Sequence, residues 1–331
     1  MKELADILKV SVSTVSKALN DSYEISDRTK ERVKKFAKRY NYQPNQLGVH
    51  LKSGKTKTIG VILPSILNIF FTQVLLGIEK IAEKEGYSII TCISNESFKK
   101  EVSNIEVLSN GSTDGFIVAI AKETELKKSF NHFNDAIQQG NPVVMFDRIT
   151  DIVNCDKVVV DDFSNAMMAT KHLINNECRK IAIVSTIDDL SVGKLRTSGY
   201  KKALLESESF NKVSKELIIR GNTTNIDNKI NELLISKKVD GIFALDENAS
   251  LAAVRIVKSK GFKIPEDISI IGYASDKIAN NLTPELTTIN LHAIKIGESA
   301  AQILIERLNY KNSRQFKTKT IKATIVKRCS S

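Results

Sequence analysis

Residues 11–20 read Ser-Val-Ser-Thr-Val-Ser-Lys-Ala-Leu-Asn, and they decide how the N-terminal part of this 331-residue chain is interpreted. Val15 and Leu19 are four positions apart, so a helix would turn both toward a core and leave the small polar residues and Lys17 outside. Such a helix can approach a nucleic-acid duplex closely, with hydroxyl groups donating to phosphates and a lysine reaching a guanine edge. The alternative is that these residues are only helix caps and solvated surface.

The first 40 residues carry apolar side chains at helical spacing and show no strand-like alternation. Three groups mark the buried faces: Leu4, Ala5 and Leu8; Val15 and Leu19; and Val33, Phe36, Ala37 and Tyr40. Ser11 and Ser26 stand where they could cap the second and third helices. Pro44 ends the pattern, because the residue before a proline is pushed out of the helical region. The sequence therefore predicts three short helices around a small core.

The positive charge of the chain is concentrated at this end. The whole chain has 49 Lys and Arg against 38 Asp and Glu, a formal net charge of +11. Residues 1–58 hold 13 basic and 6 acidic side chains and carry +7, so the other 273 residues carry only +4. A basic head on a nearly neutral body favours a module that binds a polyanion, joined to a part with a different task.

The pattern changes after a polar stretch over residues 45–57, which we expect to be a linker or a marginal helix. Short β-branched runs then alternate with stretches of helical length, and the runs cover residues 59–63, 87–93, 116–120, 143–146, 158–160, 181–184, 242–245 and 268–273. Runs that are apolar on both faces indicate parallel sheets covered on both sides. The body is large for one doubly wound sheet, so we expect two α/β lobes.

Several classes of protein are disfavoured by what the sequence lacks. The four cysteines are scattered, with no C-x-x-C and no histidine at metal-ligand spacing, so neither a metal site, a disulfide framework nor a cofactor is expected. There is no signal-peptide pattern and no apolar run of ~18 residues, so we expect a soluble cytoplasmic protein without membrane contact.

Besides a protein that binds nucleic acid through its basic head, two other functions fit parts of the chain. A solute-binding protein without DNA function fits a two-lobe body, but the basic head and the missing signal peptide argue against it. An enzyme on an α/β scaffold is possible in principle, because fold does not fix function. However, Gly54-Lys55-Thr56 lacks the upstream glycine of a phosphate-binding loop, and neither H-E-x-x-H nor G-x-S-x-G occurs. We therefore do not expect enzymatic activity.

The ordered motifs of the whole chain resemble the lactose-repressor/galactose-repressor (LacI/GalR) family of bacterial transcription regulators. The headpiece motifs are residues 4–6, 10–20, 25–33 and 42–45, and the body motifs are residues 58–64, 146–148, 160–162, 196–200, 264–273 and 282–288. Each motif alone is weak, but the set in this order is highly specific. The resemblance implies a small all-α helix-turn-helix headpiece joined to a two-lobe α/β body like the periplasmic binding proteins, with two Rossmann-like parallel sheets.

The resemblance also divides the chain into parts. It implies a headpiece over residues 1–44 and a hinge helix over residues 45–57. The first lobe would comprise residues 58–159 plus 288–316, and the second lobe residues 160–287 plus 317–331. The chain would cross between the lobes near Val160, Thr288 and Lys317.

For the headpiece, the resemblance implies a repressor that binds near-palindromic operator DNA as a homodimer. Base edges would be read by Val12, Ser13 and Lys17, and phosphates would be contacted, or the helix braced, by Ser11, Thr14, Ser16 and Asn20. In the hinge, which folds on operator DNA in this family, Leu51 would wedge into the minor groove, and Asn45 and Lys52 would also lie at the DNA.

The headpiece departs from the family pattern at two places. Lys9 stands where the tight turn usually has glycine, and a left-handed conformation there would cost about 1 kcal/mol or more. This predicts a slightly remodelled turn. Gly48-Val49 replaces an Ala-Arg pair of the hinge, and glycine lowers helix propensity. Hinge folding should therefore depend more strongly on DNA.

For the body, the resemblance implies a small-molecule effector, a sugar or sugar derivative, bound between the lobes and controlling operator affinity. Phe70 and Phe71 would stack on its ring, with core packing as the alternative for each. The polar candidates are Asn68, Asn95, Asp147, Arg148, Arg196, Asp246 and Ser275, and surface ion pairing is the alternative for the charged ones. Leu245 and Ala274 replace polar residues common in the family, which predicts a less polar pocket on the second-lobe side.

Overall fold

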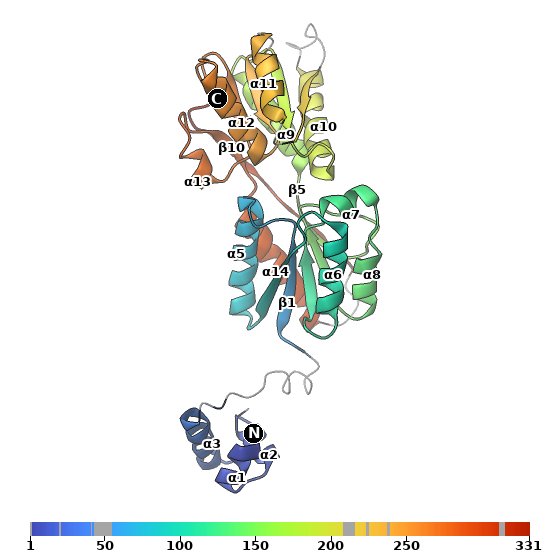
Figure 1. The fold of residues 1–331 in the computed structure, drawn as a ribbon, viewed down its shortest axis with the longest axis vertical. Coiled ribbons are helices and arrows are strands. Elements are labelled where there is room, and N and C mark those ends of the chain that lie inside the picture. The colour runs from blue at the N-terminus through green and yellow to red at the C-terminus, as the bar shows by residue number, and fades with distance from the viewer. Residues whose placement is uncertain are drawn as a thin grey trace. The chain divides into compact units, whose positions relative to one another are not determined.

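The computed structural model describes residues 2–19, 21–40, 42, 55–207, 216–222, 225–236, 239–310 and 315–331 (Figure 1). The chain divides into two compact units, Met1–Lys57 and Thr58–Ser331. Within the described residues, no helix is both long and apolar enough to cross a membrane.

The first unit contains three short helices, α1 (Lys2–Leu8), α2 (Val12–Leu19) and α3 (Asp27–Arg39). Their apolar faces meet in one small core made of Leu4, Ala5, Leu8, Val15, Ala18, Val33 and Ala37. Leu19 and Phe36 pack against this core but remain partly exposed. The predicted bundle of three helices is confirmed, because the helical spacing of these apolar residues is what a small core of this kind requires.

The turn between α1 and α2 keeps a left-handed residue, although that residue is a lysine. Lys9 has a φ of 53°. Its amide donates to the carbonyl of Asp6 at 3.2 Å, and the amide of Val10 donates to the carbonyl of Ala5 at 3.0 Å. These two bonds satisfy the last carbonyls of α1 in the manner of a left-handed helix end. The prediction of a remodelled turn is therefore wrong.

The two predicted cap residues behave differently. Ser11 caps α2, since its Oγ accepts a hydrogen bond from the amide of Thr14 at 3.0 Å. Ser26 occupies the N-cap position of α3 but makes no side-chain bond to the helix backbone. Its hydroxyl lies instead 2.9 Å from the hydroxyl of Thr29. Ser26 is therefore the N-cap residue of α3, as predicted, but its side chain does not supply the capping hydrogen bond.

The described part of the second unit contains two six-stranded sheets, one in each lobe. The first sheet has the order β11-β5-β4-β3-β1-β2 and is parallel throughout. The second has the order β12-β10-β9-β8-β6-β7 and is parallel except that β12 runs antiparallel to β10. The strands are β1 (Thr58–Leu63), β2 (Ser88–Ile93), β3 (Gly115–Val118), β4 (Val143–Phe146), β5 (Asp156–Val160), β6 (Ile181–Ser185), β7 (Leu217–Arg220), β8 (Gly241–Ala244), β9 (Ser269–Gly272), β10 (Thr287–Asn290), β11 (Thr318–Ile321) and β12 (Thr324–Val326).

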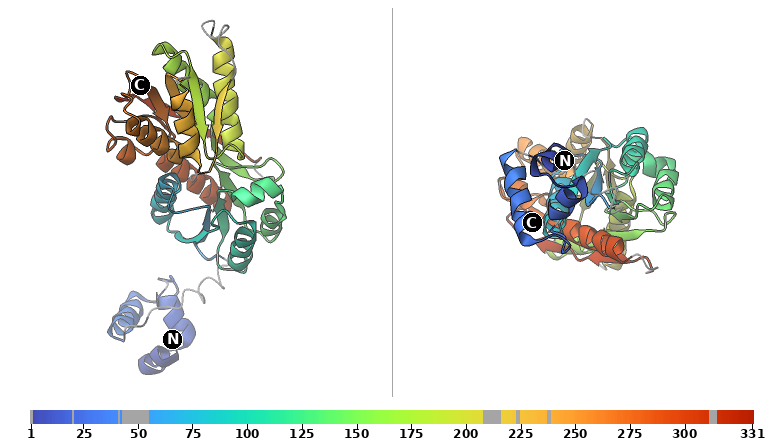
Figure 2. Two further views of the ribbon diagram at one scale, coloured as in Figure 1. Left: turned by 45° about the horizontal axis from the view of Figure 1, so that its top comes forward. Right: turned by 90° about the horizontal axis from the view of Figure 1, so that it is seen from below.

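Helices cover both faces of each sheet (Figures 1 and 2). The first lobe carries α5 (Ile69–Lys84), α6 (Phe98–Ser109), α7 (Lys122–Lys127), α8 (Asn131–Gln138) and α14 (Ala293–Asn309); the second carries α9 (Asp162–Asn175), α10 (Ser191–Glu206), α11 (Ile226–Ile235), α12 (Glu247–Ser259) and α13 (Asp276–Ala279). In β1, Ile59 and Val61 face the core under α5 and α14, whereas Ile62 faces the core under α6 and α8. Burial on both faces explains why the strand runs are apolar throughout.

The chain crosses between the lobes three times. The first crossing follows Val160, the last residue of β5. The second runs through Leu291 and His292, between β10 of the second sheet and α14 of the first lobe. The third joins β11 of the first sheet to β12 of the second. Three connections therefore join the two lobes.

The second and third crossings lie a few residues beyond the expected positions at Thr288 and Lys317. Asn290 still pairs with Thr324 in the second sheet. Thr318 still pairs with Lys157 in the first sheet. Hydrogen bonding within each sheet therefore keeps the chain in its lobe for a few residues beyond the position that the motifs indicated.

Helices α5 and α14 approach each other closely at two glycines. A Cβ on Gly77 would lie 2.0 Å from the carbonyl oxygen of Ile294, and a Cβ on Gly297 would lie 2.0 Å from that of Val74. Any larger residue would collide with helix backbone. The two glycines thereby fix α14, which begins at a lobe crossing, against α5.

Candidate functional site

The polar side of α2 faces away from the headpiece core. Val15 and Ala18 are fully buried, whereas Val12 is 40% exposed and Ser13 is exposed. Lys17, one turn after Ser13, forms an ion pair with the carboxylate of Glu24. The three predicted base-reading side chains are thus all accessible at least in part.

The residues predicted to contact phosphates fall into two groups. Ser11 is exposed, but its hydroxyl caps α2 and lies 2.7 Å from the hydroxyl of Ser13 and 2.8 Å from that of Thr14. Thr14 and Ser16 are half-buried. The other predicted DNA contacts lie outside the described residues: Asn20, Asn45, Leu51 and Lys52.

Two headpiece residues were missed by the sequence interpretation. Glu24 pairs with Lys17 across the loop that follows α2. Tyr23 beside it is 94% exposed. Their signal was weak, because Glu24 lies outside α2 and its contact with Lys17 depends on how the following loop folds back.

A cavity of about 450 Å³ lies between the two lobes of the second unit. Its lining includes, from the first lobe, Asn68, Phe70, Phe71, Asp147 and Arg148, and from the second lobe, Arg196, Asp246 and Ser275. These are all the predicted effector residues except Asn95, which is exposed and does not line the cavity. They meet because most follow the carboxyl ends of parallel strands, where open α/β sheets leave a crevice.

Asp147 sits in this cavity in a strained and poorly solvated position. Its φ is 58°, a left-handed conformation that is uncommon outside glycine. Desolvation raises the pKa of its carboxyl group to about 6, against the opposing charges of Arg148 and Arg196. Its Oδ2 lies 3.9 Å from Nε of Arg148, which is too long for a hydrogen bond. The carboxylate is therefore able to accept hydrogen bonds from a ligand.

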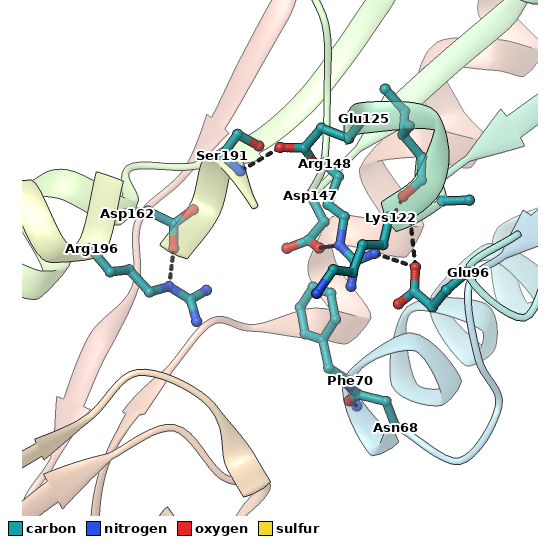
Figure 3. Close-up of polar contacts among 12 residues, drawn as sticks. Asn68, Phe70, Glu96, Lys122, Glu125, Asp147, Arg148, Asp162, Ser191 and Arg196 are labelled. Carbon is teal, nitrogen blue, oxygen red and sulfur yellow. Dashed lines mark hydrogen bonds and ion pairs between the residues drawn. The ribbon is translucent and has the colours of Figure 1, made fainter. Parts of the chain in front are cut away.

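Arg148 presents an unsatisfied donor at the same place (Figure 3). Its Nη1 donates to Oε2 of Glu96 at 2.6 Å. Its Nε is buried and has no hydrogen-bond partner among the described residues. Its guanidinium carbon lies 5.6 Å from the ring centroid of Phe71. A buried donor without a partner is costly, so the protein's own groups leave the guanidinium of Arg148 incompletely satisfied.

Arg196 enters the cavity from the second lobe and is held by three groups. Its Nε donates to Oδ1 of Asp162 at 2.7 Å, and its Nη1 donates to the carbonyl of Leu245 at 2.6 Å. Its guanidinium carbon lies 3.8 Å from the ring centroid of Tyr273. Burial alone would lower the pKa of Arg196, but Asp162 raises it above its ordinary value. The guanidinium therefore stays charged.

Asp246 lines the cavity, yet its carboxylate is occupied by the protein itself. It accepts hydrogen bonds from the amide and hydroxyl of Thr186, both at 2.7 Å, and caps α12 through the amide of Ala249 at 3.0 Å. Ser275 likewise caps α13. The structure thus gives these two predicted effector residues local structural partners.

The remaining second-lobe wall is mixed, since Glu247, Asp276 and Asn290 line it together with apolar residues. Its apolar lining includes Ile187, Leu190, Val192, Ala274 and Ile289. The side chain of Leu245 does not line the cavity, because it is packed into the sheet core. Tyr273 was missed by the sequence interpretation, although it directly follows β9; its buried hydroxyl has no partner among the described residues.

No metal centre accompanies the cavity. Across the described ranges, no cluster of three or more His, Cys, Asp or Glu side chains could hold a metal ion. Cys92, Cys155, Cys178 and Cys329 are free thiols. The chemistry of the cavity is therefore built from two arginines, a strained carboxylate and aromatic rings, which suits binding.

Comparisons with known proteins match both parts of the chain. Residues 1–45 match the bacterial regulatory proteins of the lacI family, and residues 170–331 match a periplasmic binding protein-like domain. The HTH-type transcriptional repressor PurR of Vibrio atlanticus is 30% identical over 316 residues, covering 94% of this chain and 92% of the relative. PurR of Vibrio campbellii is 29% identical over 315 residues, with the same coverage of both chains.

Solved structures show the same architecture. A LacI family transcriptional regulator from Enterococcus faecium with bound ribose is 27% identical, with a TM-score of 0.72 over 83% of this chain and 98% of that chain. The lac repressor dimer bound to operator and the anti-inducer ONPF has a TM-score of 0.85 over 99% of this chain and 97% of that chain, at 18% identity. The second likeness concerns the fold alone.

These matches exclude the two other functions considered from the sequence. A solute-binding protein without DNA function has no counterpart to the lacI-type headpiece, and the lacI family consists of DNA-binding regulators rather than enzymes. Together with the helix-turn-helix headpiece and the cavity between two lobes, they show that the chain belongs to the lacI family of bacterial regulatory proteins and is a DNA-binding transcriptional repressor controlled by a small-molecule effector.

Proposed function

We propose that the effector is a carbohydrate held between the two lobes, and that Asp147, Arg148 and Arg196 read its hydroxyl groups. The observation that carries the proposal is the unsatisfied polar set in the cavity: the Asp147 carboxylate makes no hydrogen bond with Arg148, and Nε of Arg148 has no partner among the described residues. One sugar hydroxyl can donate to the carboxylate while a neighbouring hydroxyl accepts from the guanidinium. This arrangement uses both groups at once.

Aromatic and apolar residues complete the proposed carbohydrate site. Phe70 and Phe71 stand at the start of α5, and their rings meet edge to face with centroids 5.3 Å apart. Phe71 is buried, while Phe70 is half-buried. We assign the stacking contact to Phe70, because its ring is the more accessible of the two (Figure 3). Asn68 caps α5 through the amide of Phe70 and holds that ring in place.

Thermal unfolding in the presence of a sugar series tests this proposal. The series contains pentoses, hexoses and disaccharides, including ribose and cellobiose, the ligands named for two solved relatives. A sugar present at 100 times its Kd stabilises the folded protein by about 2.7 kcal/mol. The shift should vanish in Arg148→Ala and persist in Arg179→Ala, an exposed arginine away from the cavity lining. Absence of any shift across the series contradicts a carbohydrate effector.

The proposed DNA target is a near-palindromic operator bound by a homodimer in the bacterial cytoplasm. Each headpiece would read one half-site through Val12, Ser13 and Lys17, supported by phosphate contacts from Ser11, Thr14, Ser16 and Asn20. The hinge would add Asn45, Leu51 and Lys52, with Leu51 in the minor groove. The exposed polar side of α2 and the +7 charge of residues 1–58 support this assignment.

Selection of duplexes from a random DNA pool tests the operator proposal. The full chain should enrich an inverted repeat, and sedimentation of the complex should give two chains per duplex. Enrichment of an asymmetric motif, or a complex with one chain, contradicts the homodimer. The experiment is independent of the sugar series, so either proposal can fail alone.

A further inference from the structure

The short helix α7 of the first lobe reaches across to the second lobe. It begins directly after β3 and ends at Lys127. Its side chains make two contacts with the segment that begins α10 in the other lobe. Figure 3 shows the first of them, between Glu125 and Ser191. These contacts matter because α10 carries Arg196, the second-lobe arginine of the cavity.

The first contact is a helix cap supplied by the opposite lobe. The N-cap residue of α10 is Leu190, whose side chain cannot cap the helix. The carboxylate of Glu125 instead accepts a hydrogen bond through Oε1 from the amide of Ser191, the first residue of α10. A carboxylate at a helix N-terminus satisfies an otherwise unpaired amide and interacts favourably with the helix dipole.

The second contact is an ion pair beside the cap. Nζ of Lys122 lies 3.2 Å from Oδ2 of Asp189, two residues before α10 begins. A Cβ on Gly193 would lie 2.0 Å from the carbonyl oxygen of Ile187, so the loop that carries Asp189 packs closely against the first turn of α10.

The backbone at the start of α7 is tied to the first-lobe arginine. Oε2 of Glu96 accepts hydrogen bonds both from Nη1 of Arg148 at 2.6 Å and from the amide of Lys122 at 2.8 Å. Buried Glu101 anchors the same helix start, since it accepts from the amide of Ala121 and the hydroxyl of Thr124, each at 2.6 Å. One short helix thus contacts both Glu96, which holds Arg148, and the start of α10, which carries Arg196.

We infer that Glu125 is a positioning residue of the effector site: by capping α10 from the opposite lobe, it sets the place of Arg196 relative to Arg148. The inference rests on the proposed effector site and goes beyond it, because Glu125 does not line the cavity. The lobes are then coupled at α7 as well as at the three crossings. Any ligand that pulls on Arg148 also acts on α10 through Glu96 and α7.

A double-mutant cycle on the full chain tests this inference without any ligand. Glu125→Ala removes the acceptor, and Ser191→Pro removes the donor while keeping the helix, since proline suits the first helical position. The backbone of Leu190 is extended, with ψ of 155°, as a residue before proline requires. Glu125→Ala should lower the melting temperature by about 2–4 °C in the wild-type background and leave the Ser191→Pro background unchanged.

Two further variants accompany the double-mutant cycle, one conservative and one a matched control. Glu125→Gln keeps an acceptor oxygen and should restore most of the lost stability. Glu106→Ala is the matched control, because Glu106 is an exposed helical glutamate of the same lobe with no described contact to the other lobe. An equal loss from Glu125→Ala in both backgrounds overturns the inference, since it would mean that the residue acts within α7 alone.

Hydrogen exchange locates the effect within the fold. In Glu125→Ala, the amides of residues 190–196 should exchange roughly tenfold faster, while those of α12 in the same lobe keep their rate. Acceleration of the whole second lobe in step, or none at residues 190–196, contradicts the positioning role. No sugar is present in either measurement, so a failed sugar series and a failed cycle are separate results.

Discussion

At the scale of single residues, the cavity holds a carboxylate in conditions that disfavour its charge. Asp147 is largely buried, and desolvation raises the pKa of its carboxyl group to about 6, with Asp162 and Glu125 adding to the rise. In the unfolded chain the same group titrates near 3.8. The folded state therefore binds this proton more tightly, and the free energy of unfolding falls as the pH rises from about 4 to about 6. A ligand that donates hydrogen bonds to the carboxylate would recover part of this loss.

Asp147→Asn should therefore stabilise the folded protein in a pH-dependent way. The gain should be about 3 kcal/mol near pH 7.5 and about 1 kcal/mol near pH 4.5, because the wild-type group is mostly protonated at the lower pH. Asparagine tolerates the φ of 58° at this position, so the backbone need not change. Urea unfolding of both proteins at the two pH values measures the difference. Equal gains at both pH values would contradict the raised pKa.

The sequence could predict most cavity residues but not how each is engaged. Asp147, Arg148 and Asp246 directly follow strand-forming runs, so their common location follows from parallel-sheet topology. Engagement depends on contacts between distant segments: Asp246 is occupied by Thr186, sixty residues earlier, while the nearest charged group to Asp147 in the described part of the chain is its neighbour Arg148, at 3.9 Å. Tyr273 and Glu96 were missed because their importance arises only from the positions of the two arginines.

At the scale of elements, the residue that ends α1 has a backbone conformation that is energetically unfavourable for a lysine. Lys9 adopts a φ of 53°, and its neighbours make the two hydrogen bonds of a left-handed helix end. Lys9→Gly should stabilise the headpiece by about 1 kcal/mol, since glycine removes the Cβ that opposes this conformation. Amide hydrogen exchange of residues 4–8 in the full chain measures the gain.

Lys35→Gly provides the control for that prediction. Lys35 is exposed in the middle of α3, so glycine there should destabilise the helix by about 1 kcal/mol relative to a good helix former. The two glycine substitutions should therefore act in opposite directions. Faster exchange in Lys9→Gly would show that the lysine makes stabilising contacts that outweigh its backbone strain.

The contact between α5 and α14 should be intolerant of any side chain. Gly297→Ala places a Cβ 2.0 Å from the carbonyl oxygen of Val74, so the helices must separate. We expect a loss of about 2–4 kcal/mol in the free energy of unfolding, because overpacking against backbone cannot be relieved by rotamer changes. Urea unfolding measures the loss. Gln302→Ala, exposed on the same helix, should be neutral within about 0.5 kcal/mol.

The elements themselves were largely predictable, and their junctions were not. Helical spacing in residues 4–40 and apolar runs in the body identified helices and strands, because burial on one or both faces leaves a periodic trace. The crossings after Asn290 and Ile321 were misplaced by a few residues, since β10 and β11 are short and pair with strands far away in the chain. Such pairing leaves no local pattern. The close approach of α5 and α14 was also missed, because a glycine in a helical sequence does not indicate which other helix packs against it.

At the scale of the whole molecule, charge and binding tasks are divided along the chain. Residues 1–58 carry +7 of the +11, while the cavity in the second unit is lined by both charges, including Arg148 and Arg196 with Asp147 and Asp246. The basic part suits a polyanion, and the balanced cavity suits a small polar ligand. Within the headpiece, Lys17 is itself paired with Glu24 and must exchange that partner in order to reach a base.

Two lysine substitutions should separate base reading from charge attraction. Lys17→Ala should relax the base preference at one position of each half-site in duplexes selected by the full chain, because the cation that we propose to read a base is gone. Lys55→Ala should weaken binding to all duplexes alike and reduce the slope of log affinity against log salt by about one. Fluorescence anisotropy over a salt series, with selected and scrambled duplexes, measures both effects. If both substitutions changed only the salt slope, Lys17 would be a phosphate contact and not a base contact. Base recognition by α2 would then depend on Val12 and Ser13 alone. Release of Lys17 from Glu24 would in that case play no part in sequence specificity.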